Sequence, residues 1–402
     1  MYGCYDGCGN DRLLIQSPFQ LLRLVNSAPS DEPETSQKTG DSLSAPRRCL
    51  ACRDSAMLKM MPGTQAPRHP EMTSTATSEP SSRPLRAVVI GGSGQLGCWL
   101  LWTLAQRGHS ASGTYASVQF PGLVRLDAGE LQPAADWITE QAADVVFYPA
   151  GFTWVDGCER DRSRAYAANL EQPLNLARAA ATVGARFVYF STDYVFDGEA
   201  GPYTEESATN PLSVYGRAKR DAELALEHEL GAEQLTIRTS WVFGPERQGK
   251  NFAYQLLRNL AEKKPTVCPS DQVSNPSYGP DVARVAVLLA EERASGLIHV
   301  VGPEVIDRVQ FARAIAGAFG HDDGLIVGKS TAELGQGAPR PLNGGLKTPR
   351  LDAAHPGIMR PLAAALENFR ATLLDPELGS WVQPVAGFPV NRPQHEGTRP
   401  SA

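Results

Sequence analysis

Tyr215 and Lys219 are four residues apart in the stretch Pro211–Lys219. On an α-helix this spacing places the two side chains on one face. A phenol with a pKa of about 10 is a poor acid or base at neutral pH, and a neighbouring ammonium group favours the phenolate and lowers that pKa. The pair could therefore transfer a proton to a substrate. By itself, however, the Tyr-x-x-x-Lys pattern is more common on the solvated face of an amphipathic helix.

The stretch Ser191–Gly198 follows the apolar run Phe187–Phe190. A short apolar run predicts a buried parallel strand, and residues just past the carboxyl end of such a strand line the ligand crevice of a doubly wound sheet. Thr192 lies at this position. Its hydroxyl could hydrogen-bond the oxygen that Tyr215 protonates while a nicotinamide supplies hydride to carbon. Together with a dinucleotide motif, this threonine favours the catalytic interpretation of Tyr215 and Lys219.

That dinucleotide motif is the glycine-rich stretch Gly91–Gly97, between the apolar run Arg86–Ile90 and an expected helix over Gln95–Gln106. It fits G-x-x-G-x-x-G, which needs glycine for a tight turn, for close approach of the backbone to a pyrophosphate and for packing of the helix on the strand. The helix N-terminus offers free N–H groups to the phosphates. The residues expected to bind the cofactor are Gly91, Ser93, Gly94, Gln95, Leu96, Gly97, Asp127, Ala150, Gly151, Tyr215 and Lys219.

The second strand is expected to end at Gly113–Ser117, a stretch without a carboxylate. An acidic residue there would bind the ribose hydroxyls of NAD and would repel a 2′-phosphate. The stretch contains no arginine either, so we expect NADPH as the cofactor and allow NADH. Asp127 could contact the adenine or could simply cap a turn.

Apolar runs alternate with helical stretches through the middle of the chain, as at Asp144–Tyr148, Leu235–Arg238 and Leu297–Val301. Strands separated by helices of this length predict an α/β fold with a doubly wound parallel sheet of the NAD(P)-binding Rossmann type. We expect this domain to span residues 85–375, with a smaller substrate-binding lobe built mainly from its C-terminal part.

Both ends of the chain have a different composition. Residues 27–84 hold 8 Pro, 10 Ser and 6 Thr and lack Val, Ile, Phe, Trp and Tyr, so this stretch cannot bury enough apolar area to offset its ordering entropy. We expect residues 1–84 to be a disordered extension and 376–402 a disordered tail. Translation could also begin at Met72. Four cysteines of the extension could hold zinc or could be unstructured thiols, namely Cys4, Cys8, Cys49 and Cys52.

Charge and hydropathy exclude several classes of protein. The formal net charge of −6 argues against a nucleic-acid binder. No apolar run approaches the roughly 18 residues of a membrane helix, and no basic stretch followed by an apolar core begins the chain as in a secretory signal. Seven cysteines are too few for a disulfide-stapled module of this length. We therefore expect a cytoplasmic globular protein, with no membrane partner and no catalytic metal, since the expected domain lacks metal-ligand spacing.

Several stretches together resemble the extended short-chain dehydrogenase/reductase superfamily, and within it the dTDP-4-dehydrorhamnose reductase family. The resemblance covers about residues 86–372, and the block Ser191–Gly198 is very specific to this family and its near relatives. The stretches that match in order are Gly91–Gly97, Val155-Asp156 with Glu159, Ser191–Gly198, Tyr215–Lys219, Arg238–Gly244 running on to Gly249–Phe252, Asp271-Gln272 and Arg340–Asn343.

The resemblance implies NAD(P)H-dependent reduction of the C4 keto group of a nucleotide sugar, namely dTDP-4-dehydro-L-rhamnose to dTDP-L-rhamnose, and allows a homodimer. Lys219 would also hold the nicotinamide ribose, and Asn169 would support the active-site helix or act as a helix cap. The implied catalytic triad is Thr192, Tyr215 and Lys219. The implied substrate-binding residues are Thr153, Asp193, Tyr194 and Trp241, each of which could instead have a packing or capping role.

The chain departs from the family pattern after the expected strand Asp144–Tyr148. The family commonly has an Asn-Ala-Ala-like turn there, whereas this chain has bulky Phe152 and Trp154, which bears on sugar specificity. One alternative is a non-catalytic NADP-binding subunit like the regulatory subunit of methionine adenosyltransferase, but the stretch Arg238–Trp241 resembles the reductases. Another is a sugar-nucleotide epimerase or dehydratase, which would carry the acidic ribose ligand that Gly113–Ser117 lacks.

Overall fold

The structure is a computed structural model that describes residues 83–386 and 388. The cysteines at positions 4, 8, 49 and 52 and the alternative start at Met72 lie outside the described residues. So does most of the expected extension 1–84. The domain boundaries expected from the sequence therefore stay a prediction at the N-terminal side.

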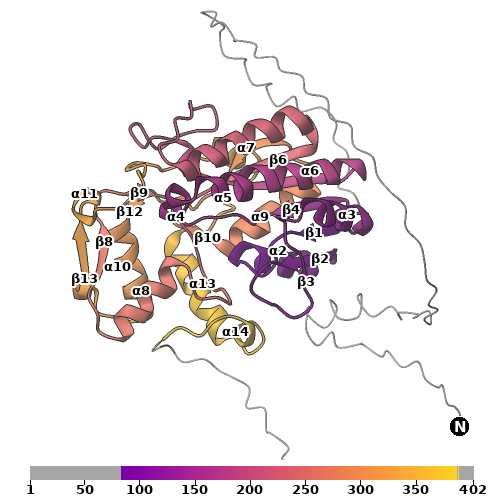
Figure 1. Ribbon diagram of the computed structural model, residues 1–402. Helices are drawn as coiled ribbons and strands as arrows, with labels where there is room; N and C mark the ends of the chain where they lie inside the picture. Colours follow the sequence, from indigo (N-terminus) through magenta and orange to yellow (C-terminus); the bar gives the residue numbers. More distant parts are fainter. Residues whose placement is uncertain (1–82, 387, 389–402) are drawn as a thin grey trace, which may run out of the picture. The chain divides into compact units, whose positions relative to one another are not determined.

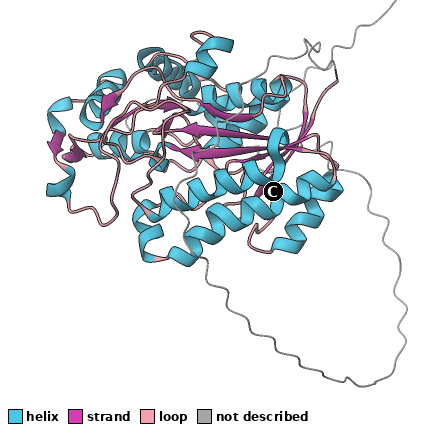
Figure 2. Cartoon of the chain, turned by 90° about the horizontal axis from the view of Figure 1, so that it is seen from above, coloured by secondary structure: helices cyan, strands magenta, loops and turns pink. Residues whose placement is uncertain are grey.

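Seven parallel strands form the central sheet, in the order β11-β6-β5-β4-β1-β2-β3. The strand order reverses between β1 and β4, the point at which open α/β sheets bind ligands. The predicted doubly wound Rossmann sheet is confirmed, and Figure 2 shows its strands between helices on both sides. The strands are β1 (Arg86–Val89), β2 (Ser110–Tyr115), β3 (Val124–Arg125), β4 (Val145–Tyr148), β5 (Arg186–Thr192), β6 (Gln234–Thr239) and β11 (Gly296–His299).

Side chains alternate between two apolar layers, as expected for strands buried on both faces. In β1, Val88 joins the core with α3, α6 and α7, whereas Ala87 and Val89 join the core with α2 and α9. Helix α2 packs on α9, and α3 packs on α6. These helices are α2 (Gln95–Gln106), α3 (Leu131–Gln141), α6 (Gln172–Thr182), α7 (Val214–Leu230) and α9 (Gly279–Glu291).

A smaller lobe, on the left of Figure 1, contains the helices α8 and α10 and two two-stranded sheets, Thr266–Pro269 with Ile326–Lys329 and Val273–Ser274 with Ile306–Asp307. The Phe311 ring joins it to the main domain, with its centroid 5.1 Å from that of Phe243 and 6.1 Å from that of Trp241. The strands pair as β7 (Val242–Phe243) with β10 (Ser277–Tyr278), β8 (Thr266–Pro269) with β13 (Ile326–Lys329), and β9 (Val273–Ser274) with β12 (Ile306–Asp307). The helices not yet given are α4 (Val155–Arg160), α5 (Arg162–Tyr166), the π-helix η1 (Ala167–Glu171), α8 (Phe252–Ala261), α10 (Arg308–Phe319), α11 (Thr331–Leu334), α12 (Pro349–Ala354), α13 (Leu362–Leu374), α14 (Leu378–Trp381), and the 3-10 turns η2 (Asp193–Val195), η3 (Gly231–Glu233) and η4 (Asp323–Leu325).

The folded domain continues past the expected boundary at residue 375. Helix α14 brings the buried Trp381 ring onto Trp99 of α2, with 5.0 Å between ring centroids. Val382 and Val385 are buried as well. The prediction of a tail from residue 376 therefore needs correction, because these apolar side chains anchor a segment whose proline and glycine content suggests solvated chain.

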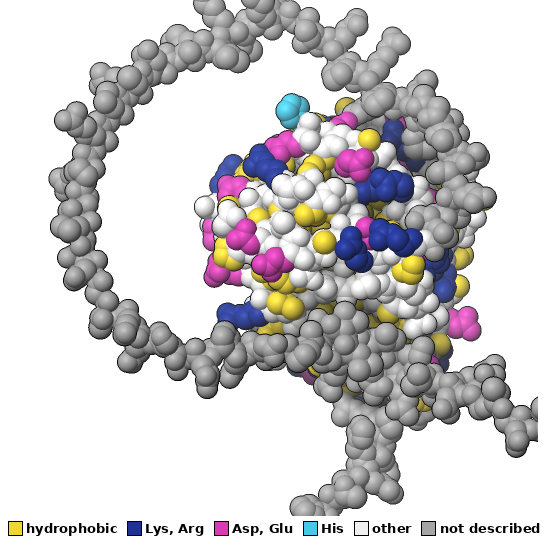
Figure 3. Space-filling view, turned by 90° about the vertical axis from the view of Figure 1, so that its right-hand side faces the viewer, with side chains coloured by type: hydrophobic (Ala, Val, Ile, Leu, Met, Phe, Trp, Pro, Cys, Tyr) yellow, Lys and Arg dark blue, Asp and Glu magenta, His cyan; other side chains and the backbone are white. Residues whose placement is uncertain are grey.

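Three further features of the described residues concern membrane spans, metal-ligand groups and surface charge. No helix of the described residues is long and apolar enough to cross a membrane. Within this part of the chain, no group of three or more His, Cys, Asp or Glu side chains is placed to hold a metal ion. On the face in Figure 3, basic and acidic side chains are interspersed.

Candidate active site

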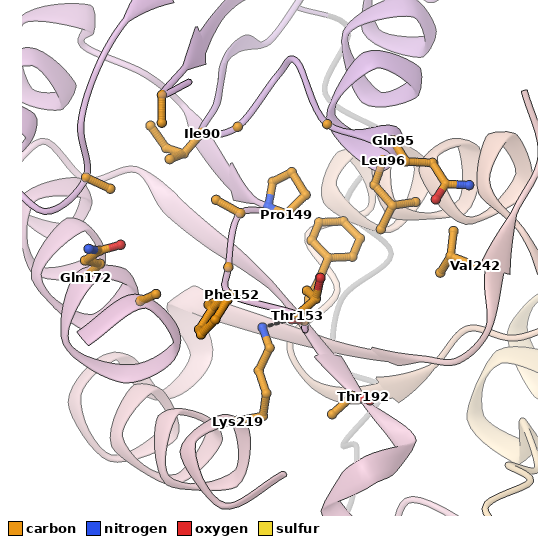
Figure 4. Close-up of a pocket in the computed structure, with 18 of the residues that line it drawn as sticks. Ile90, Gln95, Leu96, Pro149, Phe152, Thr153, Gln172, Thr192, Lys219 and Val242 are labelled. Atoms are coloured by element: carbon orange, nitrogen blue, oxygen red, sulfur yellow. Dashed lines mark hydrogen bonds between the residues drawn. The ribbon is translucent and has the colours of Figure 1, made fainter. Parts of the chain in front are cut away.

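A cavity of about 960 Å³ opens at the carboxyl ends of β1, β4 and β5, where the strand order reverses. Figure 4 shows Gln95 and Leu96 on one side of it, Gln172 on the other, and Lys219 directed toward the loop of Phe152 and Thr153. The sequence-predicted residues that line it are Gly91, Ser93, Gly94, Gln95, Leu96, Asp127, Ala150, Gly151, Thr153, Thr192, Asp193, Tyr194, Tyr215, Lys219 and Trp241.

Gly97 is the predicted site residue that does not line the cavity, and its role is packing. A Cβ added at Gly97 would lie 2.2 Å from the carbonyl oxygen of Gly91. Gly91 itself has φ +85°, a conformation that glycine adopts without strain. The two glycines therefore let helix α2 start directly on the loop after β1.

The same loop fits the phosphates of a dinucleotide. Helix α2 begins after Gly94 without a side-chain cap, so the N–H groups of its first turn have no side-chain acceptor from that position. Nε2 of Gln95 is buried and has no hydrogen-bond partner among the described residues. These donors at a helix N-terminus are what a pyrophosphate needs.

Thr114, Ala116, Ser117, Leu126 and Asp127 form the far wall of the cavity. The positions after β2 hold no carboxylate, as the sequence indicates. Oδ1 of Asp127 accepts a hydrogen bond from the backbone N–H of Gly129 at 2.8 Å. Asp127 therefore lies at the cavity and also caps a turn.

Thr192, Tyr215 and Lys219 are all buried, and the fold brings them together at this cavity. Thr192 ends β5, while Tyr215 and Lys219 lie four residues apart on α7. The N-terminus of α7 is fixed by Glu159, whose carboxylate accepts a hydrogen bond from the Val214 N–H at 2.7 Å.

The structure does not give the expected lowering of the Tyr215 pKa by Lys219. Burial raises the pKa of Tyr215, the neighbouring Thr192 hydroxyl lowers it, and the charge of Asp193 raises it. The Lys219 ammonium instead donates to the carbonyl oxygen of Phe190 at 2.8 Å and lies 4.4 Å from the Tyr189 ring centroid. Burial lowers the pKa of Lys219 to about 7, against the raising effect of Glu223. Tyr215 is thus protonated and suited to donate a proton.

Asn169 supports the cavity wall rather than a helix end. It lies in the π-helical turn η1, a feature that is frequent at functional sites. Its amide donates to the carbonyl oxygen of Phe152 at 3.0 Å, and its Oδ1 accepts from the Phe152 N–H at 3.2 Å. Asn169 therefore fixes the loop that carries Gly151 and Phe152.

The predicted substrate-binding residues Asp193, Tyr194 and Trp241 line the same cavity as Thr192, Tyr215 and Lys219. Oδ2 of Asp193 accepts from the Ser274 hydroxyl at 2.8 Å, and burial raises the pKa of Asp193 to about 6. The Tyr194 ring meets the Tyr215 ring edge to face at 5.7 Å. Trp241 has φ +39°, a strained conformation for a bulky residue that points to a constraint at this position.

Sequence reasoning missed several residues at the cavity. Glu246, Gln248 and Lys250 come from the segment after β7, and Arg308 lines an adjoining cavity. Lys250 belongs to the family-matching stretch Gly249–Phe252 but is not among the predicted site residues. No short-range pattern marks the other three, because they come to the site from later in the chain. Asp156 and Arg340 lie in stretches that match the family, but the local sequence does not predict the ion pair of 2.7 Å between their side chains.

A dinucleotide-type glycine loop at the switch point of a Rossmann sheet, facing a Thr, Tyr and Lys on the next strand and helix, defines an NAD(P)H-dependent oxidoreductase. Residues 85–374 match the family model described as RmlD substrate binding domain. The chain belongs to this family.

Relatives and solved structures agree with this assignment. A dTDP-4-dehydrorhamnose reductase of Mycobacterium tuberculosis (strain ATCC 25618 / H37Rv) is 34% identical over 268 residues, which is 65% of this chain and 84% of that protein. One of Streptomyces griseus is 33% identical over 299 residues, 73% of this chain and 95% of that protein. The crystal structure of dTDP-4-dehydrorhamnose reductase from Bacillus anthracis str. Ames in complex with NADP has a TM-score of 0.66 and 27% identity, covering 71% of this chain and 99% of that one. The predictions of an NAD(P)H-dependent enzyme and of its cofactor are confirmed. These similarities also support the reduction of a sugar nucleotide.

Proposed function

We propose that this enzyme reduces the C4 keto group of dTDP-4-dehydro-L-rhamnose to give dTDP-L-rhamnose. The observation that carries the proposal is the convergence of Thr192, Tyr215 and Lys219 on a cavity that the glycine loop also lines. The names of the relatives at 33–34% identity support the particular sugar.

The glycine loop fits the dinucleotide, as its uncapped helix N-terminus and the buried Gln95 amide indicate. We assign cofactor binding to this loop and to Asp127, Ala150, Gly151, Tyr215 and Lys219. When bound, the nicotinamide supplies the hydride. Lys219 would hold the ribose of the nicotinamide half, since its ammonium lies beside Gly151.

Tyr215 is the proton donor in this proposal. Its raised pKa keeps the phenol protonated at neutral pH, so the proton is available for the oxygen that becomes the C4 hydroxyl. Thr192 orients that oxygen in this proposal, because its side chain lines the same cavity as Tyr215. Thr153, Asp193, Tyr194 and Trp241 would contact the sugar nucleotide.

The two bulky residues of the loop after β4, Phe152 and Trp154, differ in their position relative to the cavity. Phe152 lines the cavity, with the Arg164 guanidinium 4.3 Å from its ring centroid. Trp154 is not among the residues lining the cavity, and 56% of its surface is exposed. We infer that Phe152 is the departure from the family turn that bears on sugar specificity.

We also retain the expected cytoplasmic location, the homodimer and the N-terminal extension as proposals. The main experiment follows NADPH oxidation over a panel of 4-keto nucleotide sugars, with the full chain and with a version that starts at Met72. Fastest turnover of dTDP-4-dehydro-L-rhamnose supports the proposal. Redox-neutral conversion of a nucleotide sugar with retained NAD would instead support the epimerase or dehydratase alternative.

A further inference from the structure

A second cavity of about 270 Å³ adjoins the main one and shares much of its wall. The residues common to both are Gln95, Thr153, Trp241, Val242, Glu246 and Lys250. Three residues line the second cavity and not the main one, namely Asn251, Phe252 and Arg308. A ligand whose sugar lies between Thr192 and Trp241 can therefore extend sideways toward Arg308.

Arg308 is the first residue of α10, and the lobe holds its guanidinium over two aromatic rings. Its Cζ lies 3.4 Å from the Trp241 ring centroid and 4.9 Å from that of Phe252. These stacked contacts fix the plane of the guanidinium. Within residues 83–386 and 388, no carboxylate lies within 4 Å of it and no hydrogen bond from it occurs.

This half-buried cation lacks the pairing that other arginines of the domain have. Arg238 makes two hydrogen bonds to Glu223, at 2.8 and 2.6 Å, and Arg340 pairs with Asp156. Burial lowers the pKa of Arg308 to about 10, and the charges of Tyr194 and Asp193 only partly oppose that effect. The protein thus holds a partly desolvated cation without a carboxylate in contact, which an anionic ligand would stabilise.

The remaining charges of the second cavity fit an anion next to Arg308. Lys250 is exposed, and its ammonium has no ion pair within the described part of the chain. Glu246 is the one carboxylate among the cavity-lining residues, and its Oε1 already accepts from the N–H groups of Lys250 and Asn251, at 2.8 and 2.5 Å. Because backbone N–H groups already bind the Glu246 carboxylate, the side chains of Arg308 and Lys250 remain available to bind an anion.

We propose that Arg308, assisted by Lys250, binds the diphosphate of the sugar nucleotide in the second cavity. The inference rests on the proposed function, because it takes the substrate to be a nucleoside diphosphate sugar. A guanidinium presents two parallel N–H donors that match two oxygens of a phosphate group. A diphosphate bridging Arg308 and Lys250 would leave the sugar beside Trp241 and the catalytic tyrosine.

The test measures binding by calorimetry of dTDP, dTMP and NADPH to the full chain. Arg308→Gln should weaken dTDP binding by about 10- to 100-fold, because it removes charged hydrogen bonds, while NADPH affinity stays unchanged. The preference for dTDP over dTMP should shrink as well. Lys250→Gln should weaken dTDP binding by a smaller factor. Arg313→Gln is the matched control, since Arg313 is an exposed arginine of the same helix.

The possible outcomes distinguish a failure of this inference from a failure of the proposed function. If the unaltered chain does not bind dTDP, the proposed substrate class fails and the inference fails with it. If the unaltered chain binds dTDP and Arg308→Gln binds it equally well, the inference alone is overturned. If Arg308→Gln also loses NADPH, the fold is disturbed and Lys250→Gln decides: a selective loss of dTDP binding supports the proposal, and unchanged binding overturns it.

Discussion

The ammonium of Lys219 on α7 donates a hydrogen bond to the carbonyl oxygen of Phe190 on β5, at 2.8 Å. This contact ties α7 to the strand that ends in Thr192. Burial lowers the pKa of Lys219 to about 7, well below the ordinary value of 10.5. The folded state therefore binds this proton more weakly than the unfolded state, so the ammonium lowers stability near neutral pH.

Lys219→Met should abolish most activity and raise stability. We expect activity to fall by about 100-fold or more. The free energy of unfolding at pH 7 should rise by roughly 1–2 kcal/mol, since the buried charge is gone. In the unaltered protein this free energy should increase with pH between about 7 and 10.5, where the unfolded chain binds the extra proton. Denaturant titrations over this range test the effect, and a variant with the same pH slope would contradict it.

Gly97→Ala should prevent cofactor binding, because the added Cβ would lie 2.2 Å from the Gly91 carbonyl oxygen. Helix α2 would have to move away from the phosphate loop. Gly317→Ala is the matched control, since Gly317 is inside helix α10 with no atom within 4 Å of an added Cβ. That control should gain roughly 0.5–1 kcal/mol in stability. NADPH titrations decide, and normal affinity in Gly97→Ala would refute the role assigned to this glycine.

His299 should make the protein less stable in mild acid. Burial, and then the charge of Arg238, lowers the pKa of His299 to about 3, below the ordinary 6.5. Its stabilising contribution is present above pH 6.5 and decreases as the pH falls toward 3, because only the unfolded chain takes up the proton. The decrease at pH 5 should be about 2 kcal/mol. His299→Gln should flatten this dependence, whereas exposed His228→Gln should not, and an unchanged slope in His299→Gln would count against the assignment.

Arg340 lies in the loop after α11. It pairs with Asp156 at 2.7 Å, and its charge lowers the pKa of the cavity-lining Tyr194. Arg340→Met should raise the KM for the sugar nucleotide by about tenfold and leave the KM for NADPH unchanged, because one charged hydrogen bond is lost on the substrate side. Arg350→Met is the control, as Arg350 pairs with Glu206 away from the cavity. Equal effects on both KM values would show a general loss of structure instead.

The parts of the site that could be predicted from sequence are those encoded within one element. The glycines of 91–97 and the Tyr215 and Lys219 pair are local spacings on a turn and a helix, and the structure brings them to one cavity. Helix α2 has the expected bounds, Gln95–Gln106, because its glycine-rich start and the glycine just beyond its end mark both limits.

The remainder depends on tertiary placement, which local patterns do not encode. Arg308 reaches the site because Phe311 packs the lobe against Trp241 and Phe243. The direction of the pKa shift of Tyr215 depends on burial and on the orientation of Lys219, and neither can be inferred from a spacing of four residues. The packing of Trp381 was missed because a few apolar side chains, Trp381 with Val382 and Val385, anchor a segment that is rich in proline and glycine.

The most direct test of the account is NADPH oxidation with dTDP-4-dehydro-L-rhamnose, comparing the unaltered chain with Tyr215→Phe. Tyr166→Phe is the control, because Tyr166 does not line the cavity. We expect the unaltered chain and the control to form dTDP-L-rhamnose, whereas Tyr215→Phe should lose about 100- to 10,000-fold in rate and still bind NADPH. Unchanged turnover by Tyr215→Phe, or no oxidation by the unaltered chain, would contradict it.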